Sequence, residues 1–155
     1  MVAVGDIVEV EVVSVAVFGL FCRYGEQEVL VLIPEISWIA SYNSCEQFAA
    51  PGDRFRVKVL RVDDVSGQAS GSIIALHPNP WQSDKLALGT EYRARVVRPV
   101  ASADRCGGAP GYLLELLPGA YVMLCGGPHL ECGQVRSVRI VASNSFKRSV
   151  QVALF

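Results

Sequence analysis

Two phenylalanine rings, those of Phe18 and Phe21, flank a Gly-Leu step in the first half of the chain. Alternate residues of a barrel strand face outward, so a turn at Gly19 can present both rings on one surface. Exposed rings are platforms for unstacked bases, worth about 1–3 kcal/mol per base. Arg56 and Lys58, in a later strand-like run, are candidates to meet the backbone phosphates. The alternative is that both rings are core residues.

The sequence gives less support for a metal site or a catalytic site. The chain has five cysteines without a Cys-x-x-Cys pair, and we expect reduced, mostly buried thiols. His77 lies in a Pro-rich stretch, and no nucleophile motif surrounds any cysteine. We therefore expect a protein that is not an enzyme and has no metal or other cofactor. The weak metal candidates are irregularly spaced: Cys106, Cys125, His129 and Cys132.

The composition is that of a globular protein with two electrostatically different halves. Hydrophobic residues make up 51% and charged residues 19% of 155 residues, and the mean hydropathy is +0.34. No apolar stretch reaches the roughly 20 residues of a membrane-spanning helix, and no signal peptide is recognisable, so we expect a cytoplasmic location. Residues 1–81 hold five basic and ten acidic side chains, and residues 82–155 hold nine and five.

The hydrophobic periodicity is that of strands, and it occurs twice. Residues 7–13 and 55–62 alternate apolar and charged positions after a Gly-Asp turn. The second half repeats this pattern, because residues 89–97, 133–141 and 150–154 echo residues 5–13, 52–60 and 72–76.

Five short strands per half predict an all-β protein of two tandem five-stranded OB-fold β-barrels. Two prolines in residues 77–81 cannot continue a central strand. We expect a first barrel over residues 1–77, a linker over 78–85 and a second barrel over 86–155. Residues 37–48 lack the alternation and are expected to form a short helix or an ordered loop.

Several blocks of the first half occur in the order and spacing of a known family. They are Gly5-Asp6-Ile7-Val8, Phe18-Gly19-Leu20-Phe21, residues 31–38, Pro51-Gly52-Asp53 with residues 57–63, and Asn79-Pro80-Trp81. Residues 4–81 thus resemble an S1 RNA-binding domain, in particular the repeats of the large bacterial ribosomal protein of that name. The resemblance implies an OB barrel and assigns RNA stacking to the positions of Phe18 and Phe21.

Two polar positions depart from the family pattern. The family usually has a histidine in the third strand, where this chain has Leu32. Its aspartate before the last strand is matched by Asp64, but the arginine four residues later is replaced by Gln68. This half is also acidic, and acidic surfaces repel phosphate, so the basic charge that an RNA would need lies mainly in the second half.

The second half is a diverged S1-like repeat without the Phe-Gly-x-Phe block. Arg93 and Arg95 occupy alternate positions of one strand, so they share a face. The alternative for this half is a solvated polar surface around a barrel core. The RNA-binding candidates of the second half are Arg93, Arg95, Tyr112, Arg136, Lys147 and Arg148, with Tyr121 as a further stacking candidate.

The sequence thus predicts a non-catalytic protein that binds single-stranded RNA, as a component of a translation or other ribonucleoprotein assembly, without a membrane partner. The alternative is a protein-interaction module, such as an adaptor or an immunity or antagonist protein. Such a module would keep the OB fold after losing RNA binding, and it would contact a protein partner through its acidic first barrel or an apolar surface.

Overall fold

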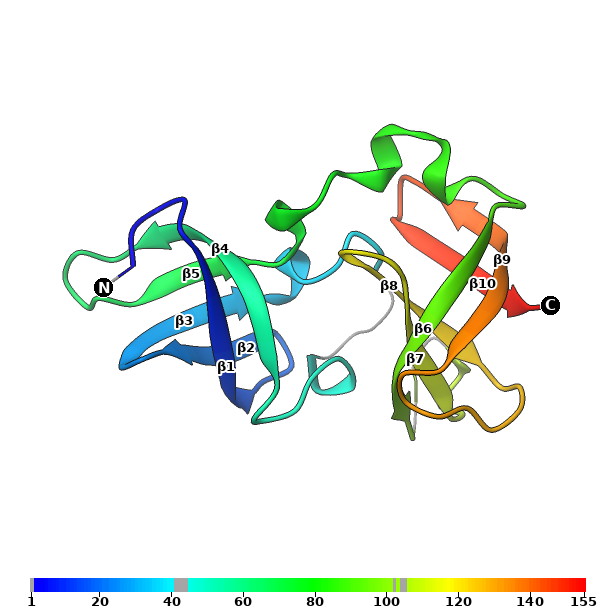
Figure 1. Ribbon diagram of the computed structural model, residues 1–155, viewed down its shortest axis with the longest axis horizontal. Helices are drawn as coiled ribbons and strands as arrows, with labels where there is room; N and C mark the ends of the chain where they lie inside the picture. The colour runs from blue at the N-terminus through cyan, green and yellow to red at the C-terminus, as the bar shows by residue number, and fades with distance from the viewer. Residues whose placement is uncertain (1, 41–44, 102, 104–105) are drawn as a thin grey trace. The chain divides into compact units, whose positions relative to one another are not determined.

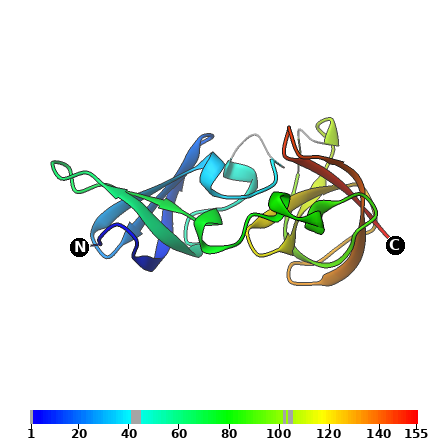
Figure 2. The same cartoon turned by 90° about the horizontal axis from the view of Figure 1, so that it is seen from above.

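The computed structural model describes residues 2–40, 45–101, 103 and 106–155. In these ranges the chain is all-β, as predicted, with short 3-10 turns in place of α-helices. None of those turns has the length or the apolar character needed to cross a membrane. Figures 1 and 2 show the strands of each of two units wrapped into a curved sheet.

The first unit is a closed five-stranded barrel with the strand order β1-β2-β3-β5-β4. Its interior is filled by inward-facing side chains such as Val29 and Val57. A Cβ on Gly71 would lie 3.0 Å from a methyl group of Val57, so β5 needs glycine at this point. The strands are β1 (Ile7–Val15), β2 (Gly19–Tyr24), β3 (Gln27–Leu32), β4 (Arg54–Val62) and β5 (Ala69–Ser72), with turns η1 (Ile33–Glu35), η2 (Cys45–Gln47) and η3 (Ile74–Leu76).

The second unit repeats the strand order in a five-stranded sheet, β10-β9-β6-β7-β8. Its ladders also repeat those of the first unit residue by residue. Phe21 pairs with Ser14 and Leu30, and Leu113 pairs with Arg98 and Met123 at the equivalent points. The elements are η4 (Pro80–Gln82), η5 (Asp84–Leu86), β6 (Glu91–Val100), β7 (Gly111–Leu117), β8 (Ala120–Cys125), β9 (Val135–Asn144) and β10 (Ser149–Leu154).

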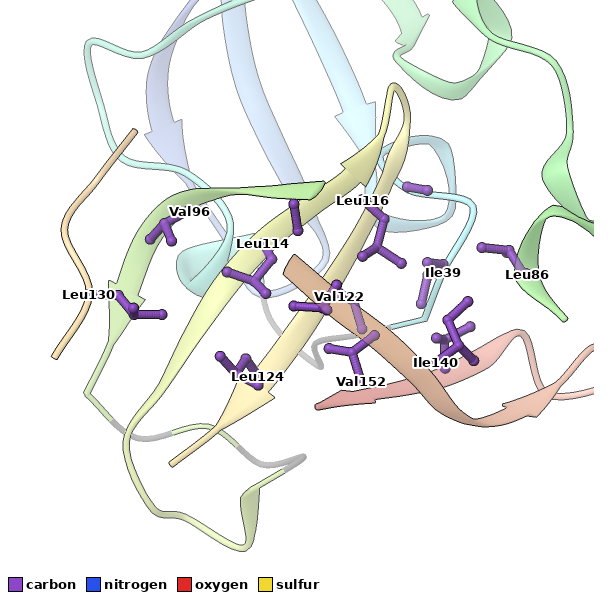
Figure 3. Packing of buried hydrophobic residues seen from close by; sticks show 14 residues of the cluster. Ile39, Leu86, Val96, Leu114, Leu116, Val122, Leu124, Leu130, Ile140 and Val152 are labelled. Atoms are coloured by element: carbon purple, nitrogen blue, oxygen red, sulfur yellow. The ribbon is translucent and has the colours of Figure 1, made fainter. Parts of the chain in front are cut away.

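The second core contains a segment from a distant part of the sequence. Ile39 is 1% exposed and packs with Leu86 and the inward side chains of β6 to β10 (Figure 3). The Trp38 N–H donates to the Gly119 carbonyl at 2.8 Å, and the Ala40 N–H donates to the Arg148 carbonyl at 2.8 Å. The segment therefore bridges the turn before β8 and the turn before β10, the two edge strands that do not pair in this sheet.

The compact units accordingly divide the chain differently from the expected ranges. The first contains residues 1–37 and 44–78, and the second contains residues 38–43 and 79–155. The residues expected to form a linker carry the turns η4 and η5, and Trp81 packs against the second core. Residues 41–44 of the expected helix or loop lie outside the described residues, and η2 is its only described helical turn.

The expectation of five reduced thiols is wrong for one pair. Cys106, in the loop before β7, forms a disulfide with Cys125 at the end of β8. Their separation of 19 residues carries no recognisable motif, and the loop brings the two sulfurs together only when β7 and β8 pair. Cys22 and Cys45 are free and buried, whereas Cys132 is free and exposed.

We predict that Ile39→Ala destabilises the second unit. Removing a buried isoleucine side chain costs about 2–5 kcal/mol, because a cavity remains. The matched control is Leu88→Ala, since Leu88 is 70% exposed and its loss should change the free energy of unfolding by less than about 0.5 kcal/mol. Urea denaturation followed by tryptophan fluorescence reports on this unit, which contains Trp38 and Trp81. Equal effects of the two changes would contradict the placement of Ile39 in this core.

We also predict one fast-reacting thiol per native chain. Burial raises the pKa of both Cys22 and Cys45 to about 11, so at pH 8 these groups are almost entirely in the unreactive thiol form. A thiol-specific chromogenic reagent without reductant should therefore modify Cys132 alone. It should modify three thiols in denaturant, and five after reduction in denaturant. Five thiols in denaturant without reductant would show that the disulfide is absent.

Candidate nucleic-acid interface

The Phe18 and Phe21 rings lie together on the outside of the first barrel. Leu20 and Cys22 face the core, at 0% and 3% exposed, so alternation turns Phe21 outward. The two ring centroids are 5.8 Å apart in an edge-to-face arrangement. Phe18 is 52% exposed and Phe21 is half-buried, so neither ring belongs to the core. A free aromatic surface is therefore available to a flat ligand.

Gly19 makes this arrangement possible. It pairs with Leu32 on β3, and a Cβ at this position would lie 2.9 Å from the Val31 carbonyl oxygen. Any side chain would push β2 away from β3, because the contact is with backbone. The glycine therefore allows β2 and β3 to pair closely directly beside the rings.

A row of outward-facing residues crosses the barrel from Phe21. Phe21 pairs with Leu30 on β3, Leu30 pairs with Ser70 on β5, and Ser70 pairs with Arg61 on β4. With Phe18 and Leu32 next to the row, these residues form what we call the ring face. It consists of Phe18, Phe21, Leu30, Leu32, Ser70 and Arg61.

Sequence reasoning missed Arg61 for a physical reason. Val57 and Val59 are buried, so simple alternation along β4 would turn residue 61 inward as well. The ladder between β4 and β5 shifts by one residue between Val59 and Arg61. This bulge moves Arg61 to the outer surface, where it is exposed. The sequence of this stretch contains no residue that marks a bulge, so simple alternation predicts the wrong side of the strand for Arg61.

The β4–β5 loop contains the remaining family position, Asp64, which is exposed. Its neighbour Asp63 shapes the loop, since its Oδ1 accepts hydrogen bonds from the backbone N–H groups of Val65 at 2.8 Å and Ser66 at 3.3 Å. These hydrogen bonds hold the pKa of Asp63 below its usual range. The Gln27 side chain donates to the Gly67 carbonyl at 2.8 Å and ties the loop to the β2–β3 turn.

Other cations of the first barrel face carboxylates. Arg23 and Arg54 both form ion pairs with Glu11, at 3.0 and 3.3 Å. Arg56 lies opposite Glu9 in the β1–β4 ladder. Lys58, by contrast, lies opposite Ile7 and is half-buried.

Lys58 and Arg61 are the remaining cations of the first barrel, and they differ in how well they are placed to bind a phosphate. Neither Lys58 nor Arg61 forms an ion pair with another described residue. Arg61 alone lies in the row that starts at Phe21. It is the cation best placed to meet a phosphate beside the rings.

The second unit has no equivalent of the ring face. The matching ladder positions of Phe18, Phe21, Leu30 and Leu32 hold Pro110, Leu113, Met123 and Cys125. A Cβ on Gly111, the counterpart of Gly19, would lie 3.1 Å from the Cys106 sulfur. Cys106 therefore lies on the side of the sheet where the first barrel carries its rings, and its disulfide with Cys125 holds it there.

The second-half candidates do not form one surface. Tyr112 packs against the core, and its hydroxyl accepts a hydrogen bond from the Leu130 N–H at 3.1 Å. Tyr121 is 7% exposed; burial and the Glu115 carboxylate raise its pKa. The Arg148 Nε donates to the Trp38 carbonyl at 3.1 Å, and its guanidinium lies over the Trp38 ring.

The other cations of the second unit differ in orientation. Arg136 pairs with the buried Ala94, so its Cβ shares the inward direction at the end of β9, where the side chain is half-buried. Lys147 is exposed in the β9–β10 turn. Arg93 and Arg95 are exposed on one face of β6, as their spacing predicts. Only these last two share a surface.

No group of three or more metal-ligating side chains occurs among the described residues. Two of the weak sequence candidates, Cys106 and Cys125, are joined to each other instead.

Residues 2–74 match the protein-family model described as S1 RNA binding domain. A polyribonucleotide nucleotidyltransferase of Streptococcus mutans is 42% identical over 83 residues, covering 53% of this chain and 11% of that protein. Small ribosomal subunit protein bS1 of Leuconostoc lactis is 32% identical over 119 residues, covering 76% of this chain and 26% of that protein.

A bS1 homolog of Bacillus cereus is 26% identical and is matched along 97% of this chain and 40% of its own length, so this similarity runs through both units. The chain spans less than half the length of each of these relatives. The strand order, the paired rings and the family match agree for the first unit. Residues 2–74 of this chain therefore belong to the S1 RNA-binding domain family.

Proposed function

We propose that the first unit binds single-stranded RNA on its ring face and catalyses no reaction there. The observation that carries the proposal is the outward-facing pair of Phe18 and Phe21, together with Arg61 in the ladder row of Phe21. Unstacked bases would lie on the rings, and the guanidinium would meet a backbone phosphate. Membership of residues 2–74 in the S1 family supports this assignment.

The acidic charge of the first unit limits how much phosphate contacts can contribute to the affinity for RNA. Its surface is acidic, and much of its basic charge already faces Glu9 and Glu11. Few phosphates can therefore be neutralised, and stacking must supply most of the affinity. The unit should bind weakly and discriminate single strands from duplexes, because bases of a duplex are not free to stack on a protein ring.

The proposed setting is cytoplasmic, in a translation or other ribonucleoprotein assembly. The names of the relatives, a ribosomal protein and a polyribonucleotide nucleotidyltransferase, support this class of role. The rival interpretation is a protein-interaction module that has lost RNA binding. It does not by itself explain why the Phe18 ring is exposed. A nuclease-resistant, stoichiometric protein partner together with no RNA affinity would favour the rival.

We predict that Phe18→Ala/Phe21→Ala weakens binding to a short single-stranded RNA by about tenfold or more. The reason is that each stacked base contributes about 1–3 kcal/mol. Fluorescence anisotropy at low salt measures the dissociation constant. Phe146→Ala is the control, since Phe146 is 96% exposed but lies outside the ring face. Wild-type affinity in the double variant, with its fold verified by circular dichroism, would contradict the proposal.

We further predict that Arg61→Gln lowers the salt dependence of RNA binding more than Arg56→Gln. Each change removes one positive charge, but Arg56 faces Glu9 and Arg61 lies in the row of Phe21. One phosphate contact contributes about 0.7 to the slope of log K against log salt for a single strand. A salt series of titrations should show that decrease for Arg61→Gln alone. The same slope change in both variants would mean that only total charge matters.

A further inference from the structure

The outer surface of β6 and β9 in the second unit carries a second cluster of charge. These strands lie side by side (Figure 1), with Arg93 opposite Ser137 and Glu91 opposite Arg139. Arg93 and Arg95 point outward, because Ala94 and Val96 are in the core. We call this surface the β6–β9 wall. Its members are Glu91, Arg93, Arg95, Ser137 and Arg139, with Phe155 beside Arg139.

The matching wall of the first unit has the opposite charge on its first strand. The ladder positions of Arg93 and Arg95 correspond to Glu9 and Glu11 of β1, as both pairs of strands keep the same register. The fold does not require the exchange of Glu9 for Arg93 or of Glu11 for Arg95, because outward positions of a barrel do not contribute to the core. The two units therefore share a frame but present different electrostatic surfaces.

The wall keeps a net positive charge after its internal ion pairs are formed. Arg139 lies 2.7 Å from Glu91, and Arg95 lies 3.2 Å from Glu115 on β7. Both guanidiniums remain about half exposed, at 48% and 49%. Arg93 lies opposite the uncharged Ser137 and forms no ion pair with another described residue. It is the free cation at the centre of the wall.

An aromatic ring extends the wall. The Arg139 guanidinium lies 4.7 Å above the centroid of Phe155, and the Phe155 N–H donates to the Ser137 carbonyl at 3.3 Å. The ring is 58% exposed. A guanidinium stacked on an exposed ring offers a flat surface with a charge at its edge, which suits a base and its adjoining phosphate.

The other side of the second unit is poorly suited to RNA. The counterparts of the ring face contain no aromatic ring, and the disulfide-tethered loop lies beside them. A cavity of about 410 Å³ lies there, between β8 and β10. Its lining contains no lysine or arginine, and includes Met123, Ser143 and Gln151. These lining residues offer no positive charge to a phosphate backbone.

We propose that the second unit binds the phosphate backbone of single-stranded RNA through the β6–β9 wall, whose strands correspond to β1 and β4 of the first unit. The proposal extends the proposed function to a second surface of the same chain. The wall supplies charge, which the first unit lacks, and the ring face supplies stacking. Arg93 makes the principal phosphate contact, and Arg139 with Phe155 holds the adjoining nucleotide.

The test compares two double variants of the whole chain with equal loss of charge. Arg93→Gln/Arg139→Gln removes two cations from the wall. Arg54→Gln/Lys85→Gln removes two exposed cations that lie outside both the wall and the ring face. We expect the wall variant to lose about tenfold in affinity for a single-stranded oligoribonucleotide at low salt, and about 1.4 in salt slope, from two lost phosphate contacts. The control variant should stay within about twofold of wild type, because Arg54 and Lys85 lie outside both proposed binding surfaces.

Equal losses in the two variants would overturn the proposal, since binding would then follow total charge. The ring variant Phe18→Ala/Phe21→Ala separates this proposal from the first one. If it loses affinity while the wall variant matches its control, the ring face binds RNA and the wall does not. If the wall variant alone loses affinity, the wall binds RNA and the ring face fails. Circular dichroism of each variant establishes that the fold is kept.

Discussion

The positions of all the outward-facing groups depend on one constraint, the register of the strand ladders and the bulges that interrupt it. Burial of Leu20 and Cys22 on β2 obliges Phe21 to face solvent. A shift between Val12 and Ser14 on β1 and another between Val59 and Arg61 on β4 then exchange the inward and outward sides of those strands. Such bulges bend strands and let a short sheet close. The shift on β4 also brings Arg61 into the row of Phe21.

The second unit shows that the fold fixes the backbone register closely but leaves the outward-facing side chains free to differ. A shift between Val96 and Arg98 on β6 repeats the one on β1. Gly19 and Gly111 occupy matching positions, where an added Cβ would lie 2.9 and 2.8 Å from a carbonyl oxygen of the neighbouring strand. Inward positions stay apolar in both units because they fill a core. Outward positions are free to change, and a ring face in one unit corresponds to a loop and disulfide in the other.

Sequence alone was sufficient for features that depend on local alternation. The strands and the internal repeat follow from period-two patterns and Gly-Asp turns, which are local properties. The S1 resemblance rests on short sequence blocks such as Phe18-Gly19-Leu20-Phe21. It was insufficient where distant segments meet. Ile39 resembles a loop residue until its place in the second core is seen. The Cys106–Cys125 pair has no spacing motif, and Arg61 requires a bulge to reach the outer surface. Arg148 looks like a free cation, although its guanidinium contacts Trp38.

The division of stacking and charge between two surfaces has an energetic consequence under the two proposals. Stacking on Phe18 and Phe21 is largely insensitive to salt, whereas contacts from Arg93 and Arg139 weaken as salt rises. When one covalent chain carries both surfaces, binding at the first raises the effective concentration of RNA at the second. Two individually weak contacts can then give a useful affinity on a strand long enough to reach both. Shorter strands would occupy one surface at a time, so affinity would depend on RNA length more steeply than either surface alone requires.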